Sequence, residues 1–228
     1  MKLQLQRLVL ATALAIPVSV FALEEGGYVG QAGEGHPDVV YNFLKHFSYD
    51  QYYWGIKSQI TSNNDNRADA MDIAIFAGHG NKWFFSMTDG GVDLANAGGT
   101  SDGGWGDRDL EFAAFESCYV VPSPLEVTDW WSNWVGGSDD LFDGLHQLLS
   151  FRTVSWQSTD QKVSDRFGEL ISQNYPVWQA WFRAINEKGG DDEKGAAVMH
   201  PASDGETYYN FGADPHPDHQ SLRIWYQY

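Results

Sequence analysis

Two continuous apolar stretches constrain the fold of this 228-residue sequence more than any other feature. They are "MDIAIFA" at residues 71–77 and "LEFAAFESC" at residues 110–118, each bounded by polar or glycine residues. A short apolar run without alternation predicts a strand that is covered on both faces, as strands of parallel sheets are. We therefore predict that both stretches form central strands of a parallel sheet.

The remaining segments alternate between helical and extended patterns. The predicted helices cover residues 37–47, 138–149 with Ser138 as N-cap, and 163–190, divided at Pro176 and ended by Gly189. The predicted strands cover residues 51–60, 151–156, 195–202 and 221–228, and residues 81–92 read as a hairpin. This alternation predicts an α/β domain with a mainly parallel sheet and helices on both faces.

The first 22 residues have the pattern of a secretory signal peptide. Lys2 and Arg7 precede an apolar stretch from Leu8 to Phe21, and a small residue, Ala22, stands at the expected cleavage site. The stretch is shorter than the roughly 20 residues that a membrane-spanning helix needs, although an uncleaved anchor is the alternative. We predict a signal peptide at residues 1–22, a single domain at 23–228, secretion or periplasmic location, and no stable membrane insertion after cleavage.

The strongly acidic balance limits the partners. The formal net charge is −17, with 31 acidic against 14 basic residues. Such a surface repels nucleic acid and anionic lipid, so neither is an expected partner. It favours basic peptides or proteins as substrates, or it serves only to keep a secreted monomer in solution. Cys118 is the only cysteine, which excludes a disulfide within the chain.

The two apolar strands end in residues that suit nucleophilic catalysis. "IAIFAGHG" ends in His79 between Gly78 and Gly80, and "LEFAAFESC" ends in Cys118. Functional groups gather at the carboxyl ends of parallel strands, so neighbouring strands would bring the imidazole and the thiol together. The imidazole would activate the thiol, the glycines would let a substrate approach, and the amides of Gly80 and Cys118 would bind an oxyanion.

Each residue also has an ordinary structural explanation. A histidine at a strand end is often a hydrogen-bonding loop residue, and a cysteine that ends an apolar run is often packed in the core. The combination is more specific, because the only cysteine follows the glycine-flanked histidine by one strand. The pair therefore favours a catalytic dyad of His79 and Cys118.

An apolar strand, "GHG", and a second apolar strand ending in cysteine resemble the caspase-like cysteine peptidases, the group of caspases, legumains, gingipains, clostripain and separases. The resemblance covers residues 71–118 and extends loosely to the segments that follow. It implies a caspase-like three-layer α/β/α sandwich in which His79 and Cys118 are the dyad. The ending "ESC" is similar to that of legumain-type members, which implies that Glu116 lines the first specificity pocket. "CYVVPSP" departs from the family, in which glycine or serine often follows the cysteine.

The resemblance also bears on substrate preference. It brings "QSTDQ", residues 157–161, beside the first specificity pocket. Asp160 would then pair with a basic substrate side chain, Trp156 would form a wall against its stem, and Glu116 would add charge. Together with the acidic surface, this predicts cleavage after arginine or lysine.

Other candidate sites carry weaker signals. The glycine- and aspartate-rich loop offers Asp102, Asp107 and Asp109 as possible calcium ligands, and no other cofactor is expected. "DPHPDH" offers His216, Asp218 and His219 to a transition metal, but it also reads as a plain loop. Trp130, Trp131 and Trp134 would grip a peptide or a sugar, or they belong to the core. His146 reads as a helix residue that faces solvent or a polar pocket.

Three functions remain open at this point. The leading one is a secreted or periplasmic cysteine peptidase, or a related amide hydrolase, that uses Cys118 and His79. The second is a catalytically inactive caspase-like protein that binds a partner. The third is an extracellular metal- or glycan-binding domain with an incidental cysteine. Thiol reactivity separates the first from the others, and metal content or glycan retention would identify the third.

Overall fold

The computed structural model describes residues 23–94, 104–122, 141–215 and 222–228. The predicted signal peptide, the three tryptophans and the histidines of "DPHPDH" lie outside these ranges, as do Asp102 and Ser138. Within them, no helix combines the length and the apolar character that crossing a membrane requires.

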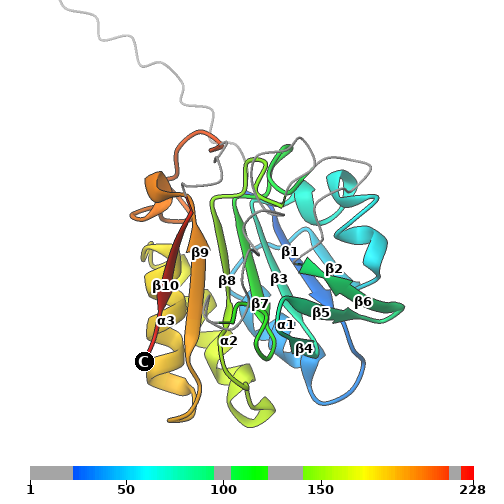
Figure 1. The fold of residues 1–228 in the computed structure, drawn as a ribbon, viewed down its shortest axis with the longest axis vertical. Coiled ribbons are helices and arrows are strands. Elements are labelled where there is room, and N and C mark those ends of the chain that lie inside the picture. The colour runs from blue at the N-terminus through cyan, green and yellow to red at the C-terminus, as the bar shows by residue number, and fades with distance from the viewer. Residues whose placement is uncertain (1–22, 95–103, 123–140, 216–221) are drawn as a thin grey trace, which may run out of the picture.

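A seven-stranded sheet forms the centre of the molecule, in the order β10-β9-β8-β7-β3-β1-β2 (Figure 1). Its strands are β1 (Glu25–Val29), β2 (Gln51–Trp54), β3 (Ile73–Ala77), β7 (Phe112–Glu116), β8 (Gln147–Phe151), β9 (Gly195–Met199) and β10 (Arg223–Tyr226). The five strands from β2 to β8 pair in parallel, while β9 pairs antiparallel with β8 and β10 antiparallel with β9. The predicted α/β class with a mainly parallel sheet is confirmed. The two apolar runs are neighbouring strands, with Ile73 opposite Phe112 and Ala77 opposite Glu116.

Three α-helices pack on one face of this sheet. They are α1 (His36–Leu44), α2 (Gln157–Ser172) and α3 (Val177–Lys188), and Figure 1 shows them behind the strands. Their buried side chains, including Phe43, Phe167 and Trp181, form one core cluster with alternate residues of the strands, such as Ile75 and Ala114. This arrangement follows from the side-chain period of two in a strand, which sends successive residues to opposite faces.

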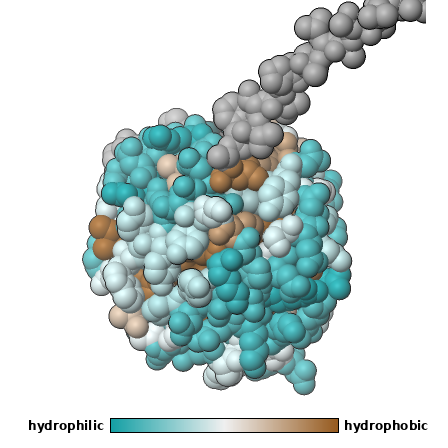
Figure 2. All heavy atoms as spheres, turned by 180° about the vertical axis from the view of Figure 1, so that it is seen from behind, coloured by the Kyte–Doolittle hydropathy of each residue, from teal (hydrophilic) through white to brown (hydrophobic). Residues whose placement is uncertain are grey.

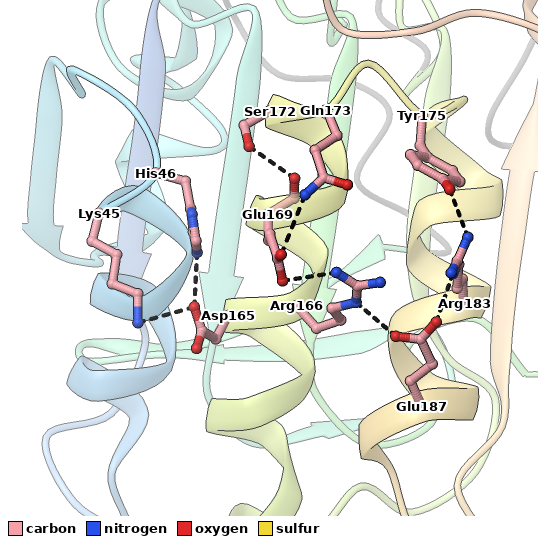
Figure 3. A network of polar contacts seen from close by, with 10 residues as sticks. All are labelled: Lys45, His46, Asp165, Arg166, Glu169, Ser172, Gln173, Tyr175, Arg183 and Glu187. Carbon is pink, nitrogen blue, oxygen red and sulfur yellow. Dashed lines mark hydrogen bonds and ion pairs between the residues drawn. The ribbon is translucent and has the colours of Figure 1, made fainter.

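The outer surface of the helices is polar. Figure 2 shows this side of the molecule as mostly hydrophilic, with small hydrophobic areas between the polar residues. Glu187 on α3 accepts from Arg166 on α2 at 2.7 Å and from Arg183 at 2.6 Å, and Asp165 pairs with Lys45 at 2.9 Å (Figure 3). The contact of Arg166 with Glu187 links α2 to α3, and that of Lys45 with Asp165 links the end of α1 to α2, while Arg183 and Glu187 both belong to α3. All lie at the solvent-exposed side, where single ion pairs contribute little to stability.

The other face of the sheet is covered differently. A small antiparallel sheet of β4 (Gly80–Asn81), β5 (Phe84–Met87) and β6 (Gly90–Asp93) lies over it, in front in Figure 1. Short 3₁₀ helices at Lys57–Gln59, Asn64–Asn66 and Ala68–Ala70 lie on the chain between β2 and β3, and another occupies Pro201–Ser203. Stacked aromatic rings fill the interior, with Phe76 and Phe115 centroids 4.7 Å apart and Trp105 beside them. Within the described ranges, α-helices therefore cover one face rather than the two expected.

The segment before and after residue 147 differs from the sequence prediction. The described part of the predicted helix 138–149 contains no helix, and β8 occupies residues 147–151 instead of 151–156. The residues of β8 are buried on both faces, with Leu148 in one core cluster and Leu149 in the other. A short apolar run of this kind carries no period that separates helix from strand, and its place between β7 and β9 decides the outcome.

Three further boundaries were wrong or missed. β1 was not predicted, because "EGGYV" contains two glycines and little branched or aromatic character. The strand expected at residues 51–60 ends at Trp54, and α2 begins at Gln157 rather than at residue 163. The hairpin, the break at Pro176, the helix end at Gly189 and strands β9 and β10 are confirmed.

Candidate active-site cleft

The neighbouring strands β3 and β7 deliver His79 and Cys118 to the same edge of the sheet. The chain leaves β3 through Gly78 and leaves β7 through Ser117, and both strands run in the same direction. The two predicted dyad residues line one cleft of about 410 Å³. Its other lining residues are His36, Gly78, Ser155, Trp156, Gln157, Ser158 and Asp160.

The glycines around His79 are required by the protein's own packing. A Cβ on Gly80 would lie 2.3 Å from the Ser117 hydroxyl and 2.7 Å from the Cys118 carbonyl oxygen. A Cβ on Gly78 would lie 3.0 Å from the Ser86 carbonyl oxygen and 3.3 Å from the Cα of Gly30. The sequence interpretation was that both glycines admit a substrate. In the structure, Gly80 lets the turn after β3 approach the cysteine loop, and Gly78 lets the chain approach Ser86 and Gly30.

The hairpin geometry also bears on the predicted oxyanion donor. The Ser86 amide donates to the His79 carbonyl at 2.8 Å, so His79 and Ser86 form a hydrogen-bonded pair. Bonded and non-bonded pairs alternate along an antiparallel ladder, and the next pair is Gly80 with Phe85. The Gly80 amide is therefore directed away from β5. Its role as an oxyanion donor, like that of the Cys118 amide, stays a prediction.

The Cys118 thiol is partly exposed and contacts Ser155. The Ser155 amide donates to the sulfur at 3.4 Å, and the serine's carbonyl and hydroxyl oxygens lie 3.7 and 3.8 Å from it. Among the described side chains, no hydrogen bond joins this sulfur to His79. Catalytic contacts are often long before substrate binds, so the shared cleft remains compatible with a dyad.

His79 interacts with two residues that the sequence interpretation missed. Its Nε2 lies 3.2 Å from a Glu34 carboxylate oxygen, and its ring meets the His36 ring edge to face at 5.7 Å between centroids. Glu34 and Gly35 have left-handed backbones, with φ of 64° and 79°, just before α1 begins. The usable signal was "EGHP", a second Gly-His pair placed directly before a helix start.

Two buried carboxylates, those of Asp160 and Glu116, differ in their relation to the cleft. Asp160, in the first turn of α2, lines the cleft and accepts from the Ser155 hydroxyl at 3.4 Å, and exposed Trp156 lines the same wall. Burial, reinforced by the charge of Glu193, raises the pKa of Asp160 to about 7. Glu116 was expected to line the specificity pocket, but it is not a lining residue of the cleft: it is 1% exposed within β7, and neither carboxylate oxygen has a hydrogen-bond partner among the described residues. Burial and the neighbouring Asp160 raise the pKa of Glu116 well above its usual value.

The predicted calcium ligands do not form one group. Asp107 lies with Asp65 and Asp69, and Asp109 lies with Asp72 and Glu111, in two separate carboxylate clusters. Asp72 and Glu111 precede β3 and β7, so the second cluster is at the opposite end of the strands from Cys118. Calcium binding by Asp107 or Asp109 stays a prediction, with different partners from those expected.

His146 also differs from its predicted setting. It precedes β8, is fully buried rather than exposed on a helix, and its Nδ1 lies 2.6 Å from a Glu206 carboxylate oxygen. This contact with Glu206 and the edge contacts with Phe112 and Phe211 give it a place in the interior, away from the cleft.

The structure therefore defines a class of α/β protein with a mainly parallel sheet and a cleft at the strand ends that is lined by a histidine and a cysteine. The chain belongs to the DUF6345 family, described as a domain of unknown function, which matches residues 18–226. A search of curated proteins found no match to the chain.

Proposed function

We propose that the protein is a thiol-dependent amide hydrolase, a cysteine peptidase in which Cys118 is the nucleophile and His79 the acid–base group. The observation that carries this proposal is that both residues line one cleft, at the carboxyl ends of two neighbouring parallel strands. A parallel sheet presents such groups at this edge, and a thiol beside an imidazole is the usual composition of a cysteine nucleophile.

The proposed reaction has two stages. The Cys118 thiol gives its proton to His79, and the sulfur attacks the carbonyl carbon of the scissile amide. The carbon–nitrogen bond breaks as His79 passes that proton to the leaving amine. His79 then accepts a proton from the water that attacks the thioester, and it returns this proton to the sulfur as the carbon–sulfur bond breaks and the acid is released. Glu34, 3.2 Å from the His79 Nε2, would hold the ring in position, and the Gly80 amide would bind the oxyanion.

The topology supports a caspase-like arrangement for this chemistry. The histidine strand β3 lies between β1 and the cysteine strand β7, and the hairpin of β4 and β5 follows the histidine directly. This agrees with the order of motifs in the caspase-like peptidases that the sequence resembles. The small sheet and 3₁₀ helices over the second face are a difference from the proposed three-layer sandwich.

Asp160 supports a preference for basic substrates. It is 3% exposed and lines the cleft that Cys118 also lines, and within the described part of the chain its Oδ1 has no hydrogen-bond partner. A guanidinium or ammonium group would supply that partner and would balance the charge that Glu193 adds near Asp160. We propose a peptide or protein substrate with arginine or lysine at the cleaved position, and an enzyme that acts outside the cytoplasm after removal of residues 1–22.

A peptide-library screen with matched variants tests the proposal. Wild-type protein should cleave peptides, and Cys118→Ala and His79→Ala should each lower kcat by several orders of magnitude while the circular dichroism spectrum is unchanged. The double variant should be no worse than either single one, because the two groups act as a unit. His46→Ala is the control, since His46 pairs with Asp165 on the helix surface.

Thiol labelling distinguishes the alternatives. If Cys118 reacts with iodoacetamide in the native protein but no peptide is cleaved, the inactive binding protein becomes the better explanation. A thiol that reacts only after denaturation would contradict the hydrolase proposal, because an enclosed sulfur cannot reach a substrate.

A further inference from the structure

Three potential metal ligands converge at the mouth of the cleft. Glu34, His36 and His79 each offer one ligand atom, and these three atoms all lie within 4.8 Å of one another. The parallel pairing of β1 with β3 explains the convergence, because the loop after β1 and the turn after β3 leave the sheet at the same edge.

His36 is the residue that the protein's own contacts leave unexplained. His36 is 4% exposed and lines the cleft, and neither of its ring nitrogens has a hydrogen-bond partner among the residues that the structure describes. A buried polar group without a partner is unfavourable for folding, so such groups usually mark a missing ligand or water. Because the His36 ring lies against the His79 ring, a single ligand could bind to both histidines.

The donor atoms of the cluster suit a cation. A neutral imidazole has the free lone pair that a metal ion needs. Glu34 contributes the negative charge that offsets part of the ion's charge.

We propose that Glu34, His36 and His79 bind a divalent transition-metal ion of the zinc class beside the Cys118 cleft. Two imidazoles and one carboxylate form a donor set typical of zinc, with a further position open to water. The ion would satisfy a buried His36 nitrogen and would replace the direct contact between His79 and Glu34. Binding itself is independent of the proposed hydrolase, but its consequence rests on that function: a metal-bound His79 could not act as the base, so zinc would inhibit turnover.

Calorimetry with zinc alone tests the proposal on untagged, metal-stripped full-length protein. We expect one ion bound per chain at this site, and His36→Gln should weaken its affinity at least tenfold, since even residues that only orient ligands contribute 10–100-fold. Glu34→Gln should weaken binding as well and serves as the second variant if His36→Gln does not fold. His46→Gln is the matched control and should bind as wild type, because His46 pairs with Asp165 instead.

Cys118→Ser separates this site from a simple thiol–imidazole site. The Cys118 sulfur is outside the three-ligand cluster, so the variant should keep its zinc affinity within about twofold. Loss of binding in Cys118→Ser, or wild-type affinity in both His36→Gln and Glu34→Gln, would overturn the assignment. Because calorimetry needs no turnover, failure of the hydrolase proposal and failure of this one give different results.

Discussion

The two ends of the parallel strands β3 and β7 have opposite chemical character. At their carboxyl ends, His79 is half exposed and Cys118 is partly exposed, and both line an open cleft. At their amino ends, Asp72 and Glu111 are buried carboxylates 7% and 5% exposed. Accessible groups therefore follow the carboxyl ends of the two strands, where the last residue of β7, Glu116, is itself enclosed, and enclosed acids precede the amino ends.

The buried acids at the amino ends have raised pKa values. Burial raises the pKa of Asp72 to about 6 and that of Glu111 to about 10, and neighbouring acids add to the effect. Asp69, nearby in sequence, has its pKa raised to about 8 by burial and by a hydrogen bond with Asp107. With these pKa values, Glu111 and Asp69 are protonated and uncharged at neutral pH.

After the loss of turnover expected for Cys118→Ala and His79→Ala, the next largest expected effect concerns Asp160 at the carboxyl end. Asp160→Asn should lower kcat/KM for peptides cleaved after arginine or lysine by roughly 30-fold or more, because breaking a buried charge pair costs about 2–5 kcal/mol. Wild-type activity on these peptides should rise with pH through about 7 as Asp160 ionises. Rates on neutral peptides, measured in parallel, should change little.

An unchanged preference for basic peptides in Asp160→Asn would contradict the proposed role of Asp160 in substrate specificity, and it would not bear on the proposed dyad. Asp191→Asn is the control, since Asp191 is an exposed loop residue beyond the cleft lining.

A larger side chain at Gly80, where the turn after β3 meets the cysteine loop, should have a somewhat smaller effect, this time on the free energy of unfolding. In Gly80→Ala the new Cβ would collide with the Ser117 hydroxyl and the Cys118 carbonyl, and forced overpacking costs about 1–3 kcal/mol of unfolding free energy. Gly205→Ala is the matched control, because a Cβ there meets nothing within 4 Å. Urea unfolding of both variants measures the difference, and equal stabilities would mean that the close approach at Gly80 does not constrain the fold.

The buried Glu111 at the amino end of β7 should make the stability of the protein depend on pH. Glu111 binds its proton more tightly in the folded state than in the unfolded state, so its contribution is complete below about pH 4.5 and is lost as pH rises toward 10. One such group changes the unfolding free energy by at most about 1.4 kcal/mol per pH unit. Glu111→Gln should therefore flatten the decline between pH 5 and 8 relative to wild type in thermal melts.

A wild-type stability that is constant over that range would contradict protonation of Glu111. Calcium bound by Asp109 and Glu111 would act in the opposite direction by favouring the ionised carboxylates. Repeating the series with added calcium therefore tests the calcium prediction, and Glu111→Gln reports whether any change arises at this cluster.

The smallest effect is expected away from both strand ends. Glu187 accepts from Arg166 and Arg183 on the helix surface, and these arginines lower its pKa to about 2. Exposed ion pairs are worth about 0–1 kcal/mol, so Glu187→Gln should shift the unfolding free energy by less than that. The shift should shrink further in 1 M salt, and a larger loss would show that this network does more than link the helix surfaces.

The sequence alone determined much of the framework. Continuous apolar runs indicated that β3 and β7 are buried on both faces, and their final residues identified His79 and Cys118 as the groups at the strand ends. Local signals such as Pro176 and Gly189 gave helix limits because they act through their own backbone. These inferences need only a residue and its immediate neighbours, which is why they could be made without a structure.

Only the tertiary structure decided which distant residues contact His79 and Cys118. Glu34 and His36 reach His79 because β1 pairs with β3, a choice of neighbour that no local pattern records. The enclosure of Glu116 and the contact between Ser155 and Cys118 likewise depend on how β7, β8 and α2 pack. Burial and contact are properties of the whole fold, so the charges and ligands around the dyad became visible only once the chain was folded.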